Sequence, residues 1–145
     1  MEHFLFPAYE FSLQQKEGKQ LIWDISRKKW VIASPEEWVR QHVLHFLVKE
    51  KGIPLSMIAV EREIAYLKRK KRFDLVVFDA QAQPFILCEC KAPSVSLTPD
   101  VAFQIATYNT VLNAPFLLIT NGLSLFFLHK KEDNSYENVP FFSSH

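Results

Sequence analysis

The chain has 145 residues, nearly half of them hydrophobic, and this composition predicts one folded domain with a substantial core rather than a disordered chain. Its formal net charge is +1, from 17 basic and 16 acidic residues, so no strong overall field attracts a polyanion. No apolar run approaches the roughly 18–20 residues that span a bilayer, and no signal-peptide pattern is present, so we expect a cytoplasmic protein with no membrane contact.

The first predicted elements form a small hairpin. Residues 1–20 have no clear pattern and are expected to be peripheral. The apolar runs 21–25 and 29–33 flank Ser26-Arg27-Lys28, which is typical of two strands joined by a turn.

A helix is expected to begin directly after this hairpin. Ser34 is a good N-cap, Pro35 fits the first helical position, and Glu37 is placed to complete a capping box. The apolar spacing predicts that the helix runs to about Lys49. His42 and His45 lie three apart on it, but with no third ligand nearby they are more simply boundary histidines than a metal site.

Three strands are expected next, over residues 58–67, 72–79 and 84–91. The basic run Lys68-Arg69-Lys70-Lys71-Arg72 is expected to form the first turn between them. Such a run is usually a solvated turn, and its functional interpretation is contact with nucleic-acid phosphates. Cys88 and Cys90, in the third strand, are poorly placed for a disulfide and too few for a zinc cage, so we expect buried, reduced thiols.

The second half of the chain adds a helix and two strands. Thr98 caps a helix expected to extend to Leu112. Residues 116–120 and 124–129 then predict two strands around Asn121-Gly122, and residues 132–145 are expected to be peripheral. The predicted fold class is therefore α/β, with a mixed central sheet and an N-terminal hairpin.

The hairpin formed by the runs 72–79 and 84–91 carries the candidate chemistry. If Asp79 faces Pro84 across the turn, the antiparallel register places Asp74 directly opposite Glu89. Two opposed carboxylates repel each other unless a cation lies between them, and a hard divalent ion such as Mg²⁺ prefers oxygen ligands of this kind. A shift of register by one residue would separate the two carboxylates.

Lys91 follows Glu89 by two residues, so the strand period places both side chains on one face. The backbone carbonyl of Cys90 is a further candidate metal ligand. Two carboxylates, a divalent ion and a lysine can together hydrolyse a phosphodiester. The plainer alternative, solvent-facing strand residues, is disfavoured because the neighbouring runs are continuously apolar and predict strands covered on both faces.

These residues also resemble a known family, the PD-(D/E)xK restriction-endonuclease-like superfamily, and most closely the N-terminal nuclease domain of type I restriction enzyme R subunits. The resemblance covers about residues 33–130, with Phe73 in place of the proline of the name motif. It rests on ordered blocks that read Ser34-Pro35-Glu36-Glu37-Trp38-Val39-Arg40-Gln41, Arg72-Phe73-Asp74-Leu75-Val76-Val77-Phe78-Asp79, Cys88-Glu89-Cys90-Lys91-Ala92-Pro93, Gln104-Ile105-Ala106-Thr107-Tyr108-Asn109 and Leu118-Ile119-Thr120-Asn121-Gly122.

The resemblance implies a core of helix, three strands, helix and strand, in which Asp74 and Glu89 bind Mg²⁺ or Mn²⁺ and Lys91 assists catalysis. It implies that Gln104 and Tyr108 match a Q-xxx-Y element on the following helix, near the DNA and the active site. Glu37 matches an acidic position that sometimes completes the metal site, although helix capping explains it equally well. Tyr108 is explained equally well by core packing.

The resulting hypothesis is a metal-dependent DNA endonuclease domain in which Asp74, Glu89, Lys91 and Gln104 are catalytic. Gln104, Tyr108 and the basic run 68–72 are the candidate DNA contacts. No P-loop glycine pattern is present, so a DNA-translocating motor or a specificity subunit would have to come from a partner. The alternative is a catalytically silent DNA-binding or assembly module that retains the nuclease fold.

Overall fold

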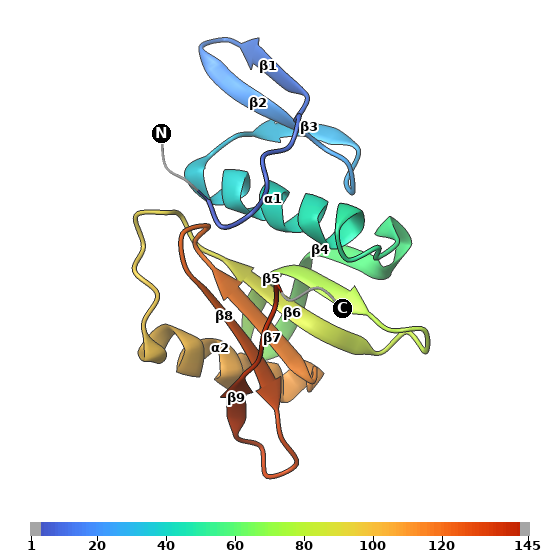
Figure 1. The fold of residues 1–145 in the computed structure, drawn as a ribbon, viewed down its shortest axis with the longest axis vertical. Helices are drawn as coiled ribbons and strands as arrows, with labels where there is room; N and C mark the ends of the chain where they lie inside the picture. Colours follow the sequence, from blue (N-terminus) through green and yellow to red (C-terminus); the bar gives the residue numbers. More distant parts are fainter. Residues whose placement is uncertain (1–3, 143–145) are drawn as a thin grey trace.

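The computed structural model describes residues 4–142 as two β-sheets and two helices (Figure 1). The smaller sheet is N-terminal and antiparallel, with strands β1 (Leu13–Lys16), β2 (Lys19–Asp24) and β3 (Lys29–Ile32). The predicted hairpin is confirmed as β2 and β3, whereas β1 lies in the segment that had no clear pattern. In Figure 1 this sheet lies on the far side of helix α1 (Pro35–Lys49) from the larger sheet.

The larger sheet has six strands in the order β4-β5-β6-β7-β8-β9. Every neighbouring pair is antiparallel except β6 and β7, which are parallel because helix α2 (Pro99–Leu112) connects them. The predicted mixed sheet is therefore confirmed. The strands are β4 (Ile58–Tyr66), β5 (Arg69–Phe78), β6 (Pro84–Cys90), β7 (Phe116–Thr120), β8 (Leu125–Lys130) and β9 (Tyr136–Asn138), and a short 3₁₀ helix (Leu55–Met57) precedes them.

Both helices begin at the caps that the sequence predicted. The Ser34 hydroxyl accepts a hydrogen bond from the Glu37 N–H at 3.1 Å, and Thr98 accepts one from Val101 at 3.3 Å. The predicted capping box is nevertheless wrong, because the Ser34 N–H donates to the Ile32 carbonyl instead of the Glu37 carboxylate. That carboxylate is used elsewhere, as described below. None of the helices in the described part of the chain is long and apolar enough to cross a membrane.

The six-stranded sheet is covered on both faces, which explains the continuous apolar runs in its strands. One core lies between the sheet and α1, and another lies between the sheet and α2. Cys88 and Cys90 are free thiols buried in the α1-side core, as predicted. Phe6 and Phe141, which belong to the segments expected to be peripheral, are also buried in the α1-side core.

The basic run 68–72 is the main correction to the predicted boundaries. Only Lys68 lies in the turn, and Arg69 to Arg72 belong to strand β5. A two-residue turn is enough because Tyr66 and Arg69 are paired across the hairpin. The basic side chains therefore lie mostly on the β5 strand that leads directly to Asp74, rather than in a loose loop.

Candidate active site

Asp74 and Glu89 lie on the two central strands β5 and β6 and are both buried, with 8% and 5% exposure. The ladder between these strands pairs Leu75 with Cys88, so its continuation by one residue brings Asp74 to Glu89, in the register that the sequence predicted. The loop end differs, because Phe78 rather than Asp79 faces Pro84 and the ladder is irregular next to it.

The β5–β6 ladder stops at the carboxylates. The Cys90 N–H donates to the side chain of Asp74, at Oδ2 and 2.7 Å, and not to a backbone carbonyl of β5. Glu89 is held from the other side, where β6 pairs with β7 in parallel. The main-chain N–H of Cys90 therefore fixes Oδ2 of Asp74, while Oδ1 faces Arg40.

The regular alternation of side chains between the two faces of the sheet is interrupted in strand β5 at Asp74. Phe73 belongs to the α2-side core and Leu75 to the α1-side core, although residues two apart normally share a face. The neighbouring strand β4 is distorted at the same level, where Glu61 has φ +56°. This local distortion, typical of sheets near functional sites, gives Asp74 access to side chains from the α1 side of the sheet.

Two lysines approach the same oxygen of Glu89. Lys71 Nζ lies 3.2 Å from Glu89 Oε1, and Lys91 Nζ lies 3.9 Å from it. Lys91 therefore shares the carboxylate face, as predicted. Lys71, which was predicted as part of a DNA-contacting run, lies at the carboxylates, with its ammonium 5.4 Å from the centre of the Tyr108 ring.

Arg40 of α1 supplies the positive charge on the other side. Its guanidinium lies 3.4 Å from Asp74 Oδ1 and 3.2 Å from Glu61 Oε1, and it makes two hydrogen bonds to Glu37. Arg27, in the turn of the N-terminal sheet, also binds Glu37 and Glu61. A buried network therefore connects the small sheet, α1 and the carboxylate pair.

Glu37 is enclosed within this network. Both of its carboxylate oxygens accept hydrogen bonds, from Arg27, Arg40 and Gln41. Within residues 4–142 the structure gathers no group of three or more His, Cys, Asp or Glu side chains that could hold a metal. The structure therefore brings Asp74 and Glu89 together but does not add Glu37 to them.

The sequence did not single out Arg40, Arg27 or Asp24, which accepts hydrogen bonds from Arg27 and Gln41. The available signal was the oppositely charged pair Glu37 and Arg40, which lie three residues apart on the predicted helix and are therefore neighbours on its surface.

Burial dominates the electrostatics of the carboxylate pair. Burial and, after it, the neighbouring Asp74 charge raise the pKa of Glu89 from 4.5 to about 7, although Lys71 and Lys91 act to lower it. Burial also raises the pKa of Asp74, although the Cys90 N–H and Arg40 oppose this. The folded protein therefore disfavours two negative charges here unless a further cation joins them.

One oxygen of this pair has no partner among the described residues. Glu89 Oε2 is buried and accepts no hydrogen bond from residues 4–142. An unpaired buried carboxylate oxygen is energetically costly, and coordination of a hard divalent cation would satisfy it. The donor chemistry of Asp74 and Glu89 therefore fits Mg²⁺ or Mn²⁺.

The predicted residues of α2 have different environments. Tyr108 packs edge-on against Tyr66 of β4, with ring centres 5.3 Å apart, and contacts the α2-side core. Gln104, one turn earlier, is exposed. Core packing thus accounts for much of Tyr108, whereas Gln104 has an accessible side chain.

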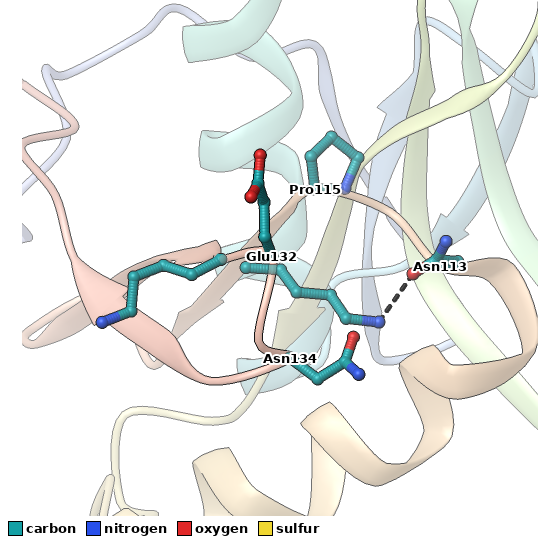
Figure 2. A pocket seen from close by; sticks show the side chains of 6 residues that line it. Asn113, Pro115, Glu132 and Asn134 are labelled. Carbon is teal, nitrogen blue, oxygen red and sulfur yellow. Dashed lines mark hydrogen bonds between the residues drawn. The ribbon is translucent and has the colours of Figure 1, made fainter.

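A separate pocket lies between the end of α2 and the β8–β9 loop (Figure 2). Its lining is polar, and Lys130 Nζ donates to Asn113 Oδ1 at 2.6 Å. It shares no lining residue with the carboxylate pair, and none of the unpartnered buried polar atoms found in residues 4–142 belongs to it. This pocket therefore lies apart from the carboxylate pair.

The fold and the site define an α/β domain with a buried carboxylate pair flanked by lysines. Residues 35–142 match the family described as type I restriction enzyme R protein N terminus, and the chain belongs to this family. A search of curated proteins found no match.

Proposed function

We propose that this chain is a metal-dependent DNA endonuclease domain that hydrolyses phosphodiester bonds. The observation that carries the proposal is the buried pair of Asp74 and Glu89, with an unpartnered Glu89 oxygen and two lysines beside it, in a member of a restriction-enzyme family. Paired carboxylates with raised pKa values in a buried position are typical of functional sites.

Asp74 and Glu89 are the residues that would hold Mg²⁺ or Mn²⁺, and the Cys90 carbonyl remains a candidate ligand. Such an ion would supply a positive charge that polarises the phosphodiester and lowers the pKa of a bound water. Glu37 is a weaker candidate, because Arg27, Arg40 and Gln41 already occupy its carboxylate.

The side chains around the pair would position the substrate and offset charge. The Cys90 N–H orients the Asp74 carboxylate, and Lys71 orients Glu89. Lys91, partly exposed beside Glu89, would orient the attacking water and offset the charge that develops on the phosphate. Gln104, exposed on α2, would contact DNA or help to orient the site.

DNA is the proposed substrate, and a motor or specificity subunit is the proposed partner, because the family is named for the R protein of type I restriction enzymes. The basic side chains of the β4–β5 hairpin and Tyr108 are the remaining candidates for DNA contact. Lys71 differs from the other members of that run, because it already pairs with Glu89.

The test is cleavage of plasmid and linear DNA by the purified chain with Mg²⁺ or Mn²⁺, compared with Asp74→Ala and Lys91→Ala. Glu63→Gln is a suitable control, since Glu63 is half-exposed on β4 and its ion pair with Lys70 is long, at 3.7 Å. We expect cleavage by the wild type and the control but not by the two site variants. Equal cleavage by all four proteins would show that the assignment is wrong.

Calorimetry with Mn²⁺ separates this proposal from a silent module that retains the fold. The nuclease assignment requires Mn²⁺ binding that Asp74→Ala abolishes. A silent module would show neither cleavage nor Asp74-dependent metal binding.

A further inference from the structure

The tip of the β4–β5 hairpin has an unusual turn. Tyr66 and Arg69 form the last pair of the ladder, so the turn consists of Leu67 and Lys68 alone. Both residues have positive φ, +49° and +66°. Two-residue hairpin turns with positive φ at both positions normally contain Asn or Gly, because a bulky L-residue is strained there.

Burial does not compensate Leu67 for this strain. The residue is 79% exposed, and no other large hydrophobic residue in residues 4–142 is more exposed. Neither the local conformation nor the core explains leucine at this position. A residue that breaks a local rule without a compensating contact suggests a role outside the folded chain.

The hairpin nevertheless holds its tip in a defined place. Ile64 is buried in the α2-side core, and the Tyr66 ring packs on Tyr108 of α2. Lys71, on the returning strand, reaches Glu89. Leu67 precedes Lys71 by four residues, which corresponds to roughly 13 Å along a strand. The tip therefore projects from the carboxylate site at a short, fixed distance.

Positive charge surrounds the exposed leucine. Lys70 has a side chain that is 80% exposed and makes a long contact, 3.7 Å, to Glu63. No ion pair involves Lys68 or Arg69 within residues 4–142. Because the net charge of the whole chain is only +1, this concentration of cations is local.

We propose that the β4–β5 hairpin tip is a wedge for the minor groove of double-stranded DNA. Leu67 enters the groove, and Lys68 and Arg69 contact phosphates on either side. Proteins that bind this groove commonly combine an apolar wedge with flanking basic residues. The basic residues lie on the same strand as Asp74, and Lys71 reaches Glu89, so this continuity with the carboxylate site favours a nucleic acid over an acidic protein surface. This inference rests on the proposed function for the choice of DNA.

The test measures fluorescence anisotropy of a labelled duplex with the full chain in EDTA, at several salt concentrations. Leu67→Asn is the informative variant, because Asn tolerates the positive φ and preserves the turn. Leu13→Asn, at a half-exposed leucine of β1, is the matched control. We expect Leu67→Asn to weaken binding about five- to tenfold with an unchanged salt slope, and the control to bind like the wild type.

Charge variants separate the wedge from the phosphate contacts. Lys68→Gln and Arg69→Gln should each reduce the magnitude of the salt slope by about 0.9, since each removes one phosphate contact. A duplex saturated with the minor-groove ligand netropsin should bind less tightly. The proposal is overturned if the wild type does not bind the duplex, or if Leu67→Asn binds it within twofold of the wild type. It is also overturned if netropsin leaves binding to the duplex unchanged, or if single-stranded DNA binds as tightly as the duplex.

The two proposals can fail separately, because the binding assay contains no metal. Cleavage by a chain whose binding ignores Leu67→Asn would overturn the wedge and leave the nuclease. Leu67-dependent duplex binding by a chain that never cleaves would overturn the nuclease and support the wedge.

Discussion

The substitution Glu89→Gln is expected to stabilise the metal-free protein at alkaline pH. Glutamine has nearly the shape of a protonated glutamate, so it removes the charge and keeps the packing. Burial and the neighbouring Asp74 raise the pKa of Glu89 from 4.5 to about 7. At 1.36 kcal/mol per pKa unit, this shift corresponds to about 3 kcal/mol of stability that the wild type lacks above pH 7.

The pH dependence follows from the direction of the shift. Well below pH 4.5 the carboxyl group is protonated in both the folded and the unfolded chain, so variant and wild type should be equally stable. Between pH 4.5 and about 7 the unfolded chain loses its proton first, and the wild type loses stability relative to the variant. Above that range the difference should be constant.

Urea unfolding in EDTA, followed by tryptophan fluorescence from acidic to alkaline pH, measures this difference. Glu63→Gln is the control, because the carboxylate of Glu63 is half-exposed and its contact with Lys70 is long, so the effect should remain within about 0.5 kcal/mol at every pH. The reasoning is refuted if Glu89→Gln is less stable than the wild type at pH 8, or if the difference does not change with pH.

Three other substitutions test separate parts of the structure, each by urea or thermal unfolding. Arg40→Gln should cost about 3 kcal/mol, because it leaves the buried Asp74 without its guanidinium partner, whereas exposed Arg72→Gln should cost under about 0.5 kcal/mol; equal costs would contradict the network. Burial lowers the pKa of His45 to about 4, so the wild type should lose stability as pH falls from 6.5 towards 4. His45→Phe should reduce that acid sensitivity, and an unchanged acid profile would contradict it. Leu67→Asn should stabilise the chain by about 0.5–1 kcal/mol by relieving the positive-φ strain, and a lower melting temperature would count against the strained turn.

Much of the local structure could be predicted from the residues themselves. Ser34 and Thr98 mark the helix starts, because a cap is a contact between residues three apart. The position of Asp74 beside Glu89 could also be predicted, since strand pairing propagates a register from one residue to the next. The predicted register is correct at the carboxylates, although Phe78 rather than Asp79 pairs with Pro84 at the turn. An irregularity of the ladder between Val77 and Phe78 compensates for this difference of one residue.

The surroundings of the carboxylates depend on contacts between residues far apart in the chain. Lys71 belongs by sequence to a basic run, and only the twist of β5 and the position of Glu89 bring it to the site. Arg40 reaches Asp74 because α1 packs on the distorted part of the sheet. The sequence alone therefore determined the helix starts, through capping, and the pairing of the two carboxylates, through the strand register. Tertiary structure alone decided which cations meet those carboxylates and how far their pKa values rise, because burial and long-range charge contacts exist only in the folded chain.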